Sequence, residues 1–533
     1  MFGFLKNNFV FTHADSKQVV SGFTGESVTD ETSLEAYSRD ASAFRVVPKK
    51  VWYPKNTEDV VALVVLCDKE KEHDENASLT VRAGGTCLSG GPLNAGWIVD
   101  MTKYMKKIHI DPIAQTATVE MGAYFRDIED AALEHGLMFA PYPSSHRLCG
   151  IGGMIGNNAS GEKSLRHGAT IDNVLELTVV LPSGEVVTMG PRSISSVDSL
   201  REKEVLSLFE KYGQALQRAA GDVRKVASGY RLDKVVSGEM FNEAALFVGS
   251  QGTLGVVTQA VLKLVPVPQF LELLVISAQT LHDLGEVIEL VRAYNPEGLE
   301  TFDSNTFKKA EIYLKEHADR MHAYIDPNAH LFILVQLSES TKQETEAQAV
   351  RCHDALRDKG YFVRHVTTET DVASLWQIRR NSLLLIRDHN EKGYKAVPCI
   401  EDVIVPIVSL GVFLEKLGSI LTRRKIEYGF HGHIGEGSFR IIPVFNFNSP
   451  SVAEDIIELM REVFVLVKEV RGNISADHSD GIIRTPFLEE FYGAELCSAF
   501  KRIKDIYDPK NSMNPKKKVG GDIAFLTQSL DRE

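Results

Sequence analysis

A glycine-rich run that leaves a strand-like segment constrains this chain more than any other feature. Residues 78–82 read as a strand, and Ala83-Gly84-Gly85-Thr86-Cys87-Leu88-Ser89-Gly90-Gly91 follow directly. Adjacent glycines let a backbone approach a pyrophosphate and aim successive N–H groups at it, with the Thr86 and Ser89 hydroxyls as further donors. No Lys-Ser or Lys-Thr follows, which excludes a Walker loop. From this segment alone, a plain glycine turn between strands is the alternative.

A second segment, residues 141–168, is also crowded with glycine and small residues. Its Gly150-Ile151-Gly152-Gly153 run is similar to the start of a dinucleotide fingerprint. That fingerprint must follow a buried strand, whereas prolines and serines precede it here. The pattern therefore argues against a Rossmann domain.

Length and composition place the chain among ordinary globular proteins. At 533 residues, two or more domains that share a cleft are expected, and 44% apolar with 25% charged residues is a typical balance. A net charge of −13 argues against nucleic acid as a partner. The N-terminal residues 1–18 lack the apolar core of a signal peptide, and no run is long and apolar enough to span a membrane. We expect a cytoplasmic protein.

The six cysteines lie far apart and include no C-x-x-C pair. Their spacing therefore supports neither a zinc ribbon nor an iron–sulfur cluster. We expect reduced thiols in the core or in loops.

Short strands alternate with helical segments through the first half, which indicates α/β or α+β layers. Residues 174–189 carry a hairpin signal, and 245–268 read as strand, glycine turn and strand before two prolines that mark a domain boundary. From 269 the pattern restarts as strand and helix units typical of a ferredoxin-like cap. A helix is expected over 451–470, and the last dozen residues read as a loose tail.

An ordered set of motifs along nearly the whole chain resembles a known family. They are YSRDASAFRVVPKKVWYPKNTEDV (37–60), VRAGGTCLSGG (81–91), PYPSSHRLCGIGGMIGNNASGEKSLRHG (141–168), SGYRL (228–232), GSQGTLGVVTQA (249–260), LWQIRRN (375–381), IEDVIVP (400–406), GHIGEGSFRIIP (432–443), ADHSDG (476–481) and DPKNSMNP (508–515). The family is the vanillyl-alcohol-oxidase (PCMH-type) superfamily of FAD-binding oxidoreductases. Its similar branch holds D-lactate dehydrogenase, the glycolate oxidase flavin subunit and D-2-hydroxyglutarate dehydrogenase.

The resemblance implies an α+β fold: a two-part PCMH-type FAD-binding domain with a ferredoxin-like cap domain. The implied division is an N-terminal segment (1–45), the FAD-binding domain (46–268), the cap or substrate domain with a segment returning to the flavin (269–520), and a tail (521–533). Covalent relatives carry histidine where Thr86 stands, so the FAD is expected to be non-covalent. The residues implied to bind FAD are Arg82, Gly84, Gly85, Thr86, Cys87, Ser89, Gly90, Pro143, Ser144, Ser145, Gly152, Gly153, Asn158, Gly161, Gly252, Thr253, Val256, Asn514 and Lys517.

The pair Asp477-His478 suits general base work, because imidazole titrates near neutral pH and a carboxylate stabilises its charged form. Both residues could instead cap a loop. The resemblance implies that His478 is the catalytic base. Relatives with a catalytic metal bind it at positions held here by His433, Arg440 and Asp477; arginine is no ligand, which weighs against a metal. His433 and Asp477 stay as candidate ligands of a zinc-like ion, with His431 as a substitute on the same strand face.

Arg379, in LWQIRRN, matches the family's carboxylate-binding position. A guanidinium can donate two parallel hydrogen bonds to an acid, although two adjacent arginines are often only a surface pair. Lys395 and Arg440 are candidates for a second carboxylate or for charge compensation.

Together these features predict an FAD-dependent dehydrogenase that oxidises a small D-2-hydroxy acid, such as D-lactate or glycolate, by hydride transfer to flavin N5. Electrons would pass to a quinone, a cytochrome or a separate iron–sulfur protein, through which the protein would associate peripherally with a membrane. A non-catalytic flavin subunit and a flavin oxidase of a sugar alcohol or lactone are the alternatives.

Overall fold

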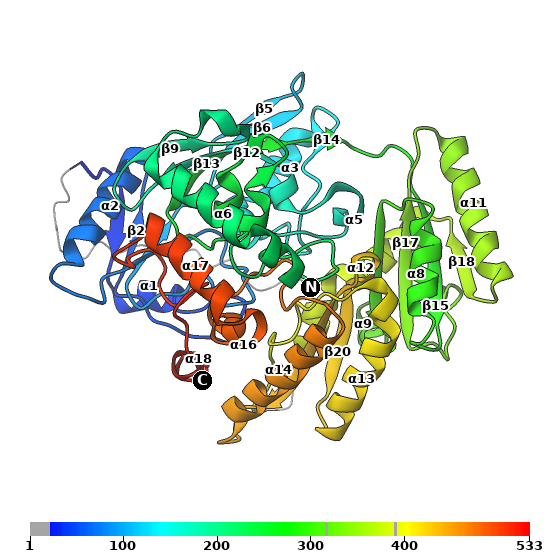
Figure 1. Cartoon of the computed structure of the whole chain (residues 1–533). Coiled ribbons are helices and arrows are strands. Elements are labelled where there is room, and N and C mark those ends of the chain that lie inside the picture. The colour runs from blue at the N-terminus through cyan, green and yellow to red at the C-terminus, as the bar shows by residue number, and fades with distance from the viewer. Residues whose placement is uncertain (1–21, 315–317, 388–391, 533) are drawn as a thin grey trace.

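The computed structural model describes residues 22–314, 318–387 and 392–532. Two lobes lie side by side, the N-terminal half in one and a large sheet with its helices in the other (Figure 1). Residues 1–18, whose sequence lacks a signal-peptide pattern, lie outside the described ranges. Within those ranges, none of the helices combines the length and apolar character needed to cross a bilayer.

The first lobe is built on two sheets. One holds, in spatial order, β1 (Glu26–Val28), β2 (Lys50–Tyr53), β4 (Trp97–Asp100) and β3 (Leu79–Arg82). The other holds β5 (Ile108–Asp111), β6 (Thr116–Glu120), β13 (Val256–Lys263), β8 (Val174–Val180) and β9 (Val186–Met189). The β8–β9 pair confirms the predicted hairpin. The glycine-rich run leaves the end of β3, so its position is fixed by a buried strand.

Helices surround these sheets and complete the first core. They are α1 (Glu31–Ala36), α2 (Thr57–Glu70), α3 (Phe125–Leu133), α4 (Ile151–Asn157), α5 (Ser164–His167), α6 (Leu200–Ala219) and α7 (Ala244–Phe247). Smaller pairings link β7 (Leu137–Met138) to β14 (Val265–Pro266) and β12 (Met240–Phe241) to both β10 (Arg192–Ser193) and β11 (Val236–Ser237). The predicted strand before the glycine turn at 249–252 is wrong, because α7 stands there. All four residues of α7 are buried, and a short, fully apolar run has the same pattern in a helix and a strand.

The second lobe contains an antiparallel seven-stranded sheet. Its spatial order is β18 (Phe362–Val366), β15 (Glu272–Ala278), β17 (Leu331–Leu337), β16 (Gly298–Asp303), β20 (Tyr428–His433), β21 (Ser438–Asn446) and β19 (Tyr394–Ala396). The first four strands have the order of a ferredoxin-like unit, with helices between β15 and β16 and between β17 and β18, as predicted. The remaining three strands widen that unit toward the first lobe.

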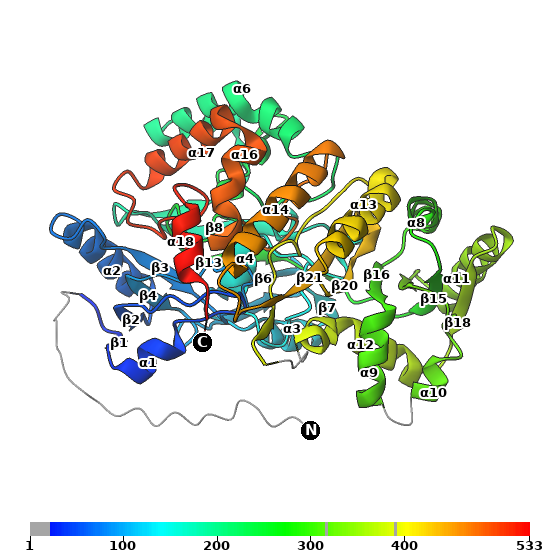
Figure 2. The ribbon, with the colours of Figure 1, turned by 90° about the horizontal axis from the view of Figure 1, so that it is seen from below.

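Both faces of this sheet are buried, since alternate residues of each strand enter different cores. On β15, Leu274 and Ile276 join one core while Leu273 and Val275 join the other. The two helical layers lie on opposite sides of the sheet in Figure 2. One layer comprises α8 (Leu284–Arg292), α11 (Lys342–Asp358), α13 (Leu410–Arg423) and α14 (Val452–Glu469). The other comprises α9 (Ser304–Leu314), α10 (Ala318–Met321) and α12 (Glu369–Arg387).

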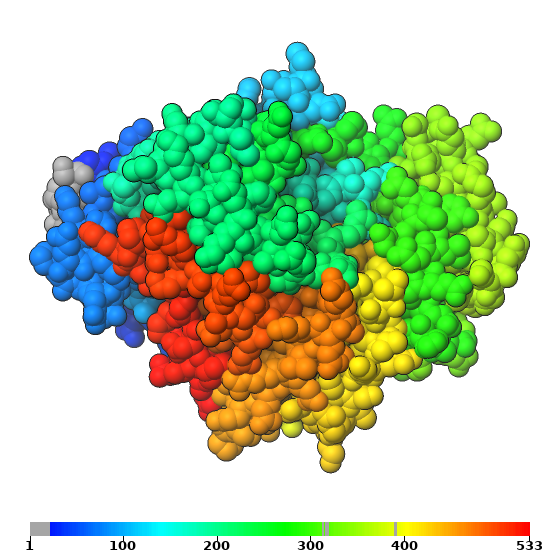
Figure 3. Space-filling model, viewed as in Figure 1, coloured from blue at the N-terminus to red at the C-terminus, as the bar shows by residue number. Residues whose placement is uncertain are grey.

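The C-terminal residues return to the first lobe. After α15 (Gly481–Arg484) and α16 (Leu488–Tyr492), helix α17 (Ala494–Tyr507) packs on α6 and buries Phe500 and Ile503 in the first core. This segment lies against the N-terminal part of the chain in Figure 3. The last dozen residues, predicted as a loose tail, include the helix α18 (Ile523–Ser529) instead. Leu526 and Leu530 are buried in the core there, which explains why this segment forms a packed helix and not a loose tail.

A cluster of ion pairs joins the two lobes. Glu297, buried next to β16, pairs with Lys163 at 3.2 Å, Arg166 at 2.8 Å and His167 at 3.3 Å. Burial alone would raise the pKa of Glu297, but these cationic neighbours hold it at about 2. The carboxylate is therefore charged at neutral pH, and α5 is tied to the cap sheet.

Candidate active site

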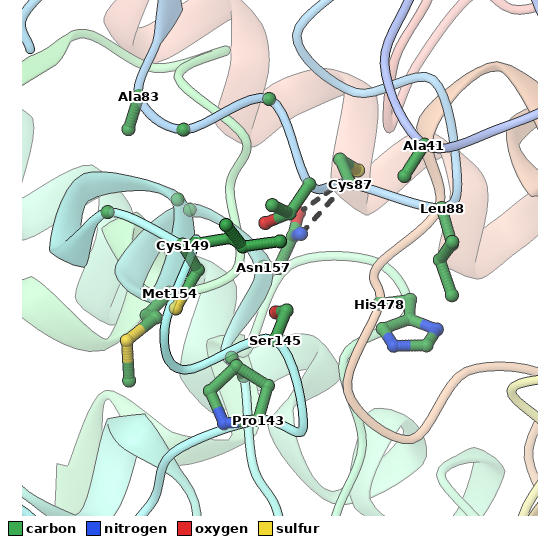
Figure 4. Close-up of a pocket in the computed structure, with 18 of the residues that line it drawn as sticks. Ala41, Ala83, Cys87, Leu88, Pro143, Ser145, Cys149, Met154, Asn157 and His478 are labelled. Atoms are coloured by element: carbon green, nitrogen blue, oxygen red, sulfur yellow. Dashed lines mark hydrogen bonds between the residues drawn. The ribbon is translucent and has the colours of Figure 1, made fainter. Parts of the chain in front are cut away.

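A cavity of about 710 Å³ lies between the two lobes. The first lobe contributes the glycine-rich run and the segment 143–157, and the cap contributes α12, β20, β21 and the turn at 477–478. In the close-up, His478 lies across the cavity from Pro143 and Ser145, and Cys87 contacts Asn157 (Figure 4). The volume is in the usual range for a small-molecule or cofactor site.

The glycine-rich run presents free backbone donors to this cavity. Residues 84–88 all line it, and within the described ranges none of their N–H groups donates to a protein acceptor. Gly84 allows the close packing behind them, because a Cβ there would lie 2.5 Å from the Leu148 carbonyl oxygen. Gly85 has a φ of 68°, which favours glycine. Five consecutive N–H groups at a cavity wall form an anion-binding concavity.

The other predicted cofactor residues fall into two groups. On the cavity wall are Arg82, Gly84, Gly85, Thr86, Cys87, Pro143, Ser144, Ser145, Gly152, Gly153 and Gly252. The lining does not include Ser89, Gly90, Asn158, Gly161, Thr253, Val256, Asn514 and Lys517.

Asn514 shows how a residue behind the wall positions it. Its side-chain amide donates to the carbonyl oxygens of Gly91 at 3.0 Å and Gln251 at 2.6 Å, and its Oδ1 accepts from Thr80 at 2.8 Å. Lys517 donates to the Leu93 carbonyl at 2.6 Å, and burial lowers its pKa to about 7. The returning C-terminal segment thus fixes the glycine-rich run from behind.

His478 is oriented by a carboxylate that sequence reasoning did not identify. Its Nδ1 lies 3.0 Å from Glu401 Oε1, whereas its Nε2 is 3.6 Å from Asp477 Oδ1. Burial would raise the pKa of Glu401, but Arg484 and His478 keep it below its usual value. An ionised Glu401 accepts a hydrogen bond from Nδ1–H of His478, and in that tautomer the free lone pair is on Nε2.

Asp402 shapes the turn that carries His478. It accepts from Ser475 Oγ at 2.5 Å and from the backbone N–H groups of Asp477 at 3.1 Å and His478 at 2.8 Å. Burial raises the pKa of Asp402 to about 6. The signal for Glu401 and Asp402 was present in IEDVIVP, because an acidic pair in an otherwise apolar run must find buried partners.

Asp477 makes hydrogen bonds to cationic neighbours and not to the His478 imidazole. Its Oδ1 accepts from Arg440 at 2.7 Å, and its Oδ2 lies 2.8 Å from Ser160 Oγ and 3.3 Å from Lys225 Nζ. Burial would raise the pKa of Asp477, but Arg440 and Lys225 hold it well below its usual range. The expectation that Asp477 is the direct partner of His478 is corrected to Glu401.

Arg379 lies in α12 and is buried, not part of a surface pair. It faces Glu300 Oε2 at 2.5 Å, but Nε and Nη2 make no aligned hydrogen bond to any described residue. The Nδ1 of buried His431 on β20 also has no hydrogen-bond partner in the described ranges. Arg379 and His431 both line the cavity. Unmet donors on buried groups are costly, so they indicate a polar ligand at this end.

Glu300, on β16, joins Arg379 to His433. Its Oε1 lies 2.7 Å from His433 Nδ1. Burial raises the pKa of Glu300 to about 7, against the opposing effect of Arg379. Burial, assisted by Lys225 and Arg440, lowers the pKa of His433 well below its usual value, so this imidazole is neutral.

The predicted residue Lys395 and the neighbour of Arg379 in the sequence, Arg380, make other contacts. Lys395 is not on the cavity wall and donates to the Asp531 carbonyl at 2.7 Å, so its predicted substrate contact is not supported. Arg380 lines the cavity but pairs with Glu162 at 2.6 Å. All six cysteines are unpaired, as expected.

Comparison with protein families identifies both lobes. The model of the "FAD binding domain" matches residues 48–190, and that of the "FAD linked oxidases, C-terminal domain" matches residues 267–518. Among solved structures, 4-ethylphenol oxidase from Gulosibacter chungangensis has a TM-score of 0.66 at 17% identity over 93% of this chain and 94% of that one. Alkyldihydroxyacetonephosphate synthase has a TM-score of 0.64 at 16% identity, and the match covers 92% of this chain and 82% of that one. At these identities the structures show the shared fold.

Curated relatives are similar over most of this chain. D-2-hydroxyglutarate dehydrogenase of Pseudomonas putida is 26% identical over 93% of this chain and 51% of the relative. The glycolate oxidase subunit GlcD of Bacillus subtilis is 27% identical over 91% of this chain and 92% of the relative. D-lactate dehydrogenase of Archaeoglobus fulgidus is 27% identical over 92% of this chain and 94% of the relative. The chain therefore spans about half the length of the hydroxyglutarate dehydrogenases it matches, and nearly all of the other two.

The cavity fits the FAD that such a domain binds. The free N–H groups of residues 84–88 suit the pyrophosphate, and His478 lines the same cavity. Position 84 on the cavity wall has no room for a side chain, because a Cβ there would collide with the backbone carbonyl oxygen of Leu148.

Proposed function

The chain belongs to the FAD-linked oxidases, and from that premise we propose that it is a dehydrogenase of small D-2-hydroxy acids of the D-lactate or glycolate kind. The observation that carries the proposal is the buried Arg379, whose Nε and Nη2 lack aligned partners in the cavity that also contains His478. A carboxylate is the ligand that a guanidinium fork binds best. The three relatives described above are named for D-2-hydroxyglutarate, glycolate and D-lactate, which supports an acid substrate.

Arg379 would bind the substrate carboxylate and so orient the carbon that bears the hydroxyl. Bound at its two unmet donors, the acid would replace the poorly aligned contact with Glu300. Together with a base at the hydroxyl group, such a charge-assisted contact restricts the orientation of the reacting carbon.

His478 would accept the hydroxyl proton at Nε2. Glu401 keeps the Nδ1 proton in place and then stabilises the imidazolium that forms, which is the role of an orienting carboxylate. FAD, when bound, supplies the hydride acceptor. Electrons would then pass to a separate acceptor, for which a quinone, a cytochrome or an iron–sulfur protein is the proposed class.

Replacing Arg379 by methionine tests the carboxylate contact. Loss of a charge-assisted bidentate contact costs about 2–4 kcal/mol, so the KM for the acid should rise by roughly one and a half to three powers of ten. FAD content should not change. The matched control is Arg357→Met on α11, whose side chain is 61% exposed and far from the cavity lining. An unchanged KM in the Arg379→Met protein would refute the assignment.

A further inference from the structure

Arg440 occupies the position in which a metal ion would be expected among the predicted ligands. Its Nη2 lies 2.7 Å from Asp477 Oδ1 and 3.3 Å from His433 Nε2, and its Nη1 lies 3.3 Å from Asp402 Oδ1. These partners come from three separate segments of the chain. One guanidinium therefore gathers the groups that a divalent cation would gather.

The lone pairs that a metal would need are already in use. A guanidinium only donates hydrogen bonds, so His433 Nε2 must accept from Arg440, and Nδ1–H then donates to Glu300 at 2.7 Å. Asp477 directs Oδ1 to Arg440 and Oδ2 to Ser160 and Lys225. Neither predicted ligand, His433 nor Asp477, offers a free atom.

Charge argues in the same direction. Asp402, Asp477 and His478 offer ligand atoms within 4.8 Å of one another, but Arg440 already contacts the first two. Burial would lower the pKa of Arg440, but the carboxylates around it, Asp477 first and Asp402 next, outweigh burial and raise that pKa, so the guanidinium stays charged at any accessible pH. A divalent ion at this cluster would face a fixed positive charge at close range in a buried site.

We propose that the Arg440 guanidinium is the resident cation of this site and that the chain works without a divalent metal. Three of its five N–H groups are used by Asp402, Asp477 and His433, and Arg440 lines the cavity. The other two donors have no partner in the described ranges. On the basis of the proposed function, they bind the hydroxyl or carboxylate oxygen of the substrate.

Metal analysis of the purified full chain with its FAD tests the proposal. The wild type should contain no stoichiometric divalent metal, and neither EDTA nor added Zn²⁺ should shift its Tm. The Arg440→His variant supplies a second imidazole beside His433 and Asp477, which completes a zinc-like ligand set. This variant should take up one Zn²⁺ per chain and gain Tm on binding. The control Arg440→Gln removes the cation without supplying an imidazole and should take up none.

A wild-type protein that retains one divalent ion per chain and loses Tm in EDTA would overturn the proposal. So would a folded Arg440→His protein that binds no Zn²⁺, since the guanidinium would then not stand at a metal position. If that variant does not fold, the wild-type metal content alone decides. Metal content is independent of turnover, so a metal-free protein that oxidises no hydroxy acid would refute only the proposed function.

Discussion

His478 takes its orientation from Glu401, a residue 77 positions away in the chain. The sequence pattern could predict an imidazole suited to base work, and it paired that imidazole with its neighbour Asp477. It could not predict Glu401, because the contact depends on how Asp402 folds the turn at 475–478. Arg379 could be predicted from its type and position, whereas its burial and its contact with Glu300 could not.

The assignment of the base predicts a specific loss of rate. His478→Asn should keep FAD and fold but slow substrate-dependent flavin reduction by roughly two to four powers of ten, the usual effect of a positioned proton acceptor. Glu401→Gln should slow it less, since an amide oxygen can still accept from Nδ1. Anaerobic stopped-flow absorbance measures both rates. A His478→Asn protein that is reduced at the wild-type rate would exclude His478 as the base.

Glu300 predicts a pH dependence of substrate binding. Burial raises its pKa to about 7, so below that pH the carboxyl is neutral and the Arg379 charge is available to the acid. Above it, the ionised Glu300 competes for Arg379, and KM should rise by up to about tenfold per pH unit.

The Glu300→Gln variant is the matched comparison for this pH effect. It shares every other titrating group with the wild type, so its KM should stay flat across the range in which the wild-type KM rises. Steady-state kinetics from about pH 6 to about pH 8.5 measure the difference. Parallel KM profiles for the two proteins would exclude Glu300 as the source of the effect.

At the scale of elements, regular patterns were predictable and short apolar runs were not. The ferredoxin-like order of β15 to β18 follows from helices and strands that alternate along the sequence. Residues 244–247 were expected as a strand but form α7, because four buried residues carry no period that separates the two structures. Tertiary packing decides such segments.

The glycine-rich run yields a prediction at this scale. In Gly84→Ala, the new Cβ would lie 2.5 Å from the Leu148 carbonyl oxygen, so the run or the segment behind it must move. The purified variant should therefore retain less FAD, measured as flavin absorbance per chain. Gly418→Ala on α13 is the control, since nothing lies within 4 Å of its added Cβ. Equal flavin content in the Gly84→Ala and wild-type proteins would contradict the pyrophosphate assignment.

At the scale of the molecule, the two lobes are interlaced rather than consecutive. β14 (Val265–Pro266) is the last strand of the first lobe along the sequence, yet α17 and Met513 also enter the core of that lobe. Phe44 and Leu530 pair across nearly the whole chain and join the other core. Sequence pattern could not predict this closure, because a helix with one apolar face does not specify which core it joins. The cavity depends on it, since Asn514 fixes the glycine-rich run.

Flavin bleaching tests most directly whether this cavity oxidises a 2-hydroxy acid. Purified protein with full FAD is mixed anaerobically with D- and L-lactate, glycolate, D-2-hydroxyglutarate and a sugar alcohol, and the flavin absorbance is followed. We expect rapid bleaching by D-lactate or glycolate and none by L-lactate or the sugar alcohol. Fully loaded protein that no hydroxy acid bleaches at any pH would contradict it and would indicate a non-catalytic flavin subunit instead.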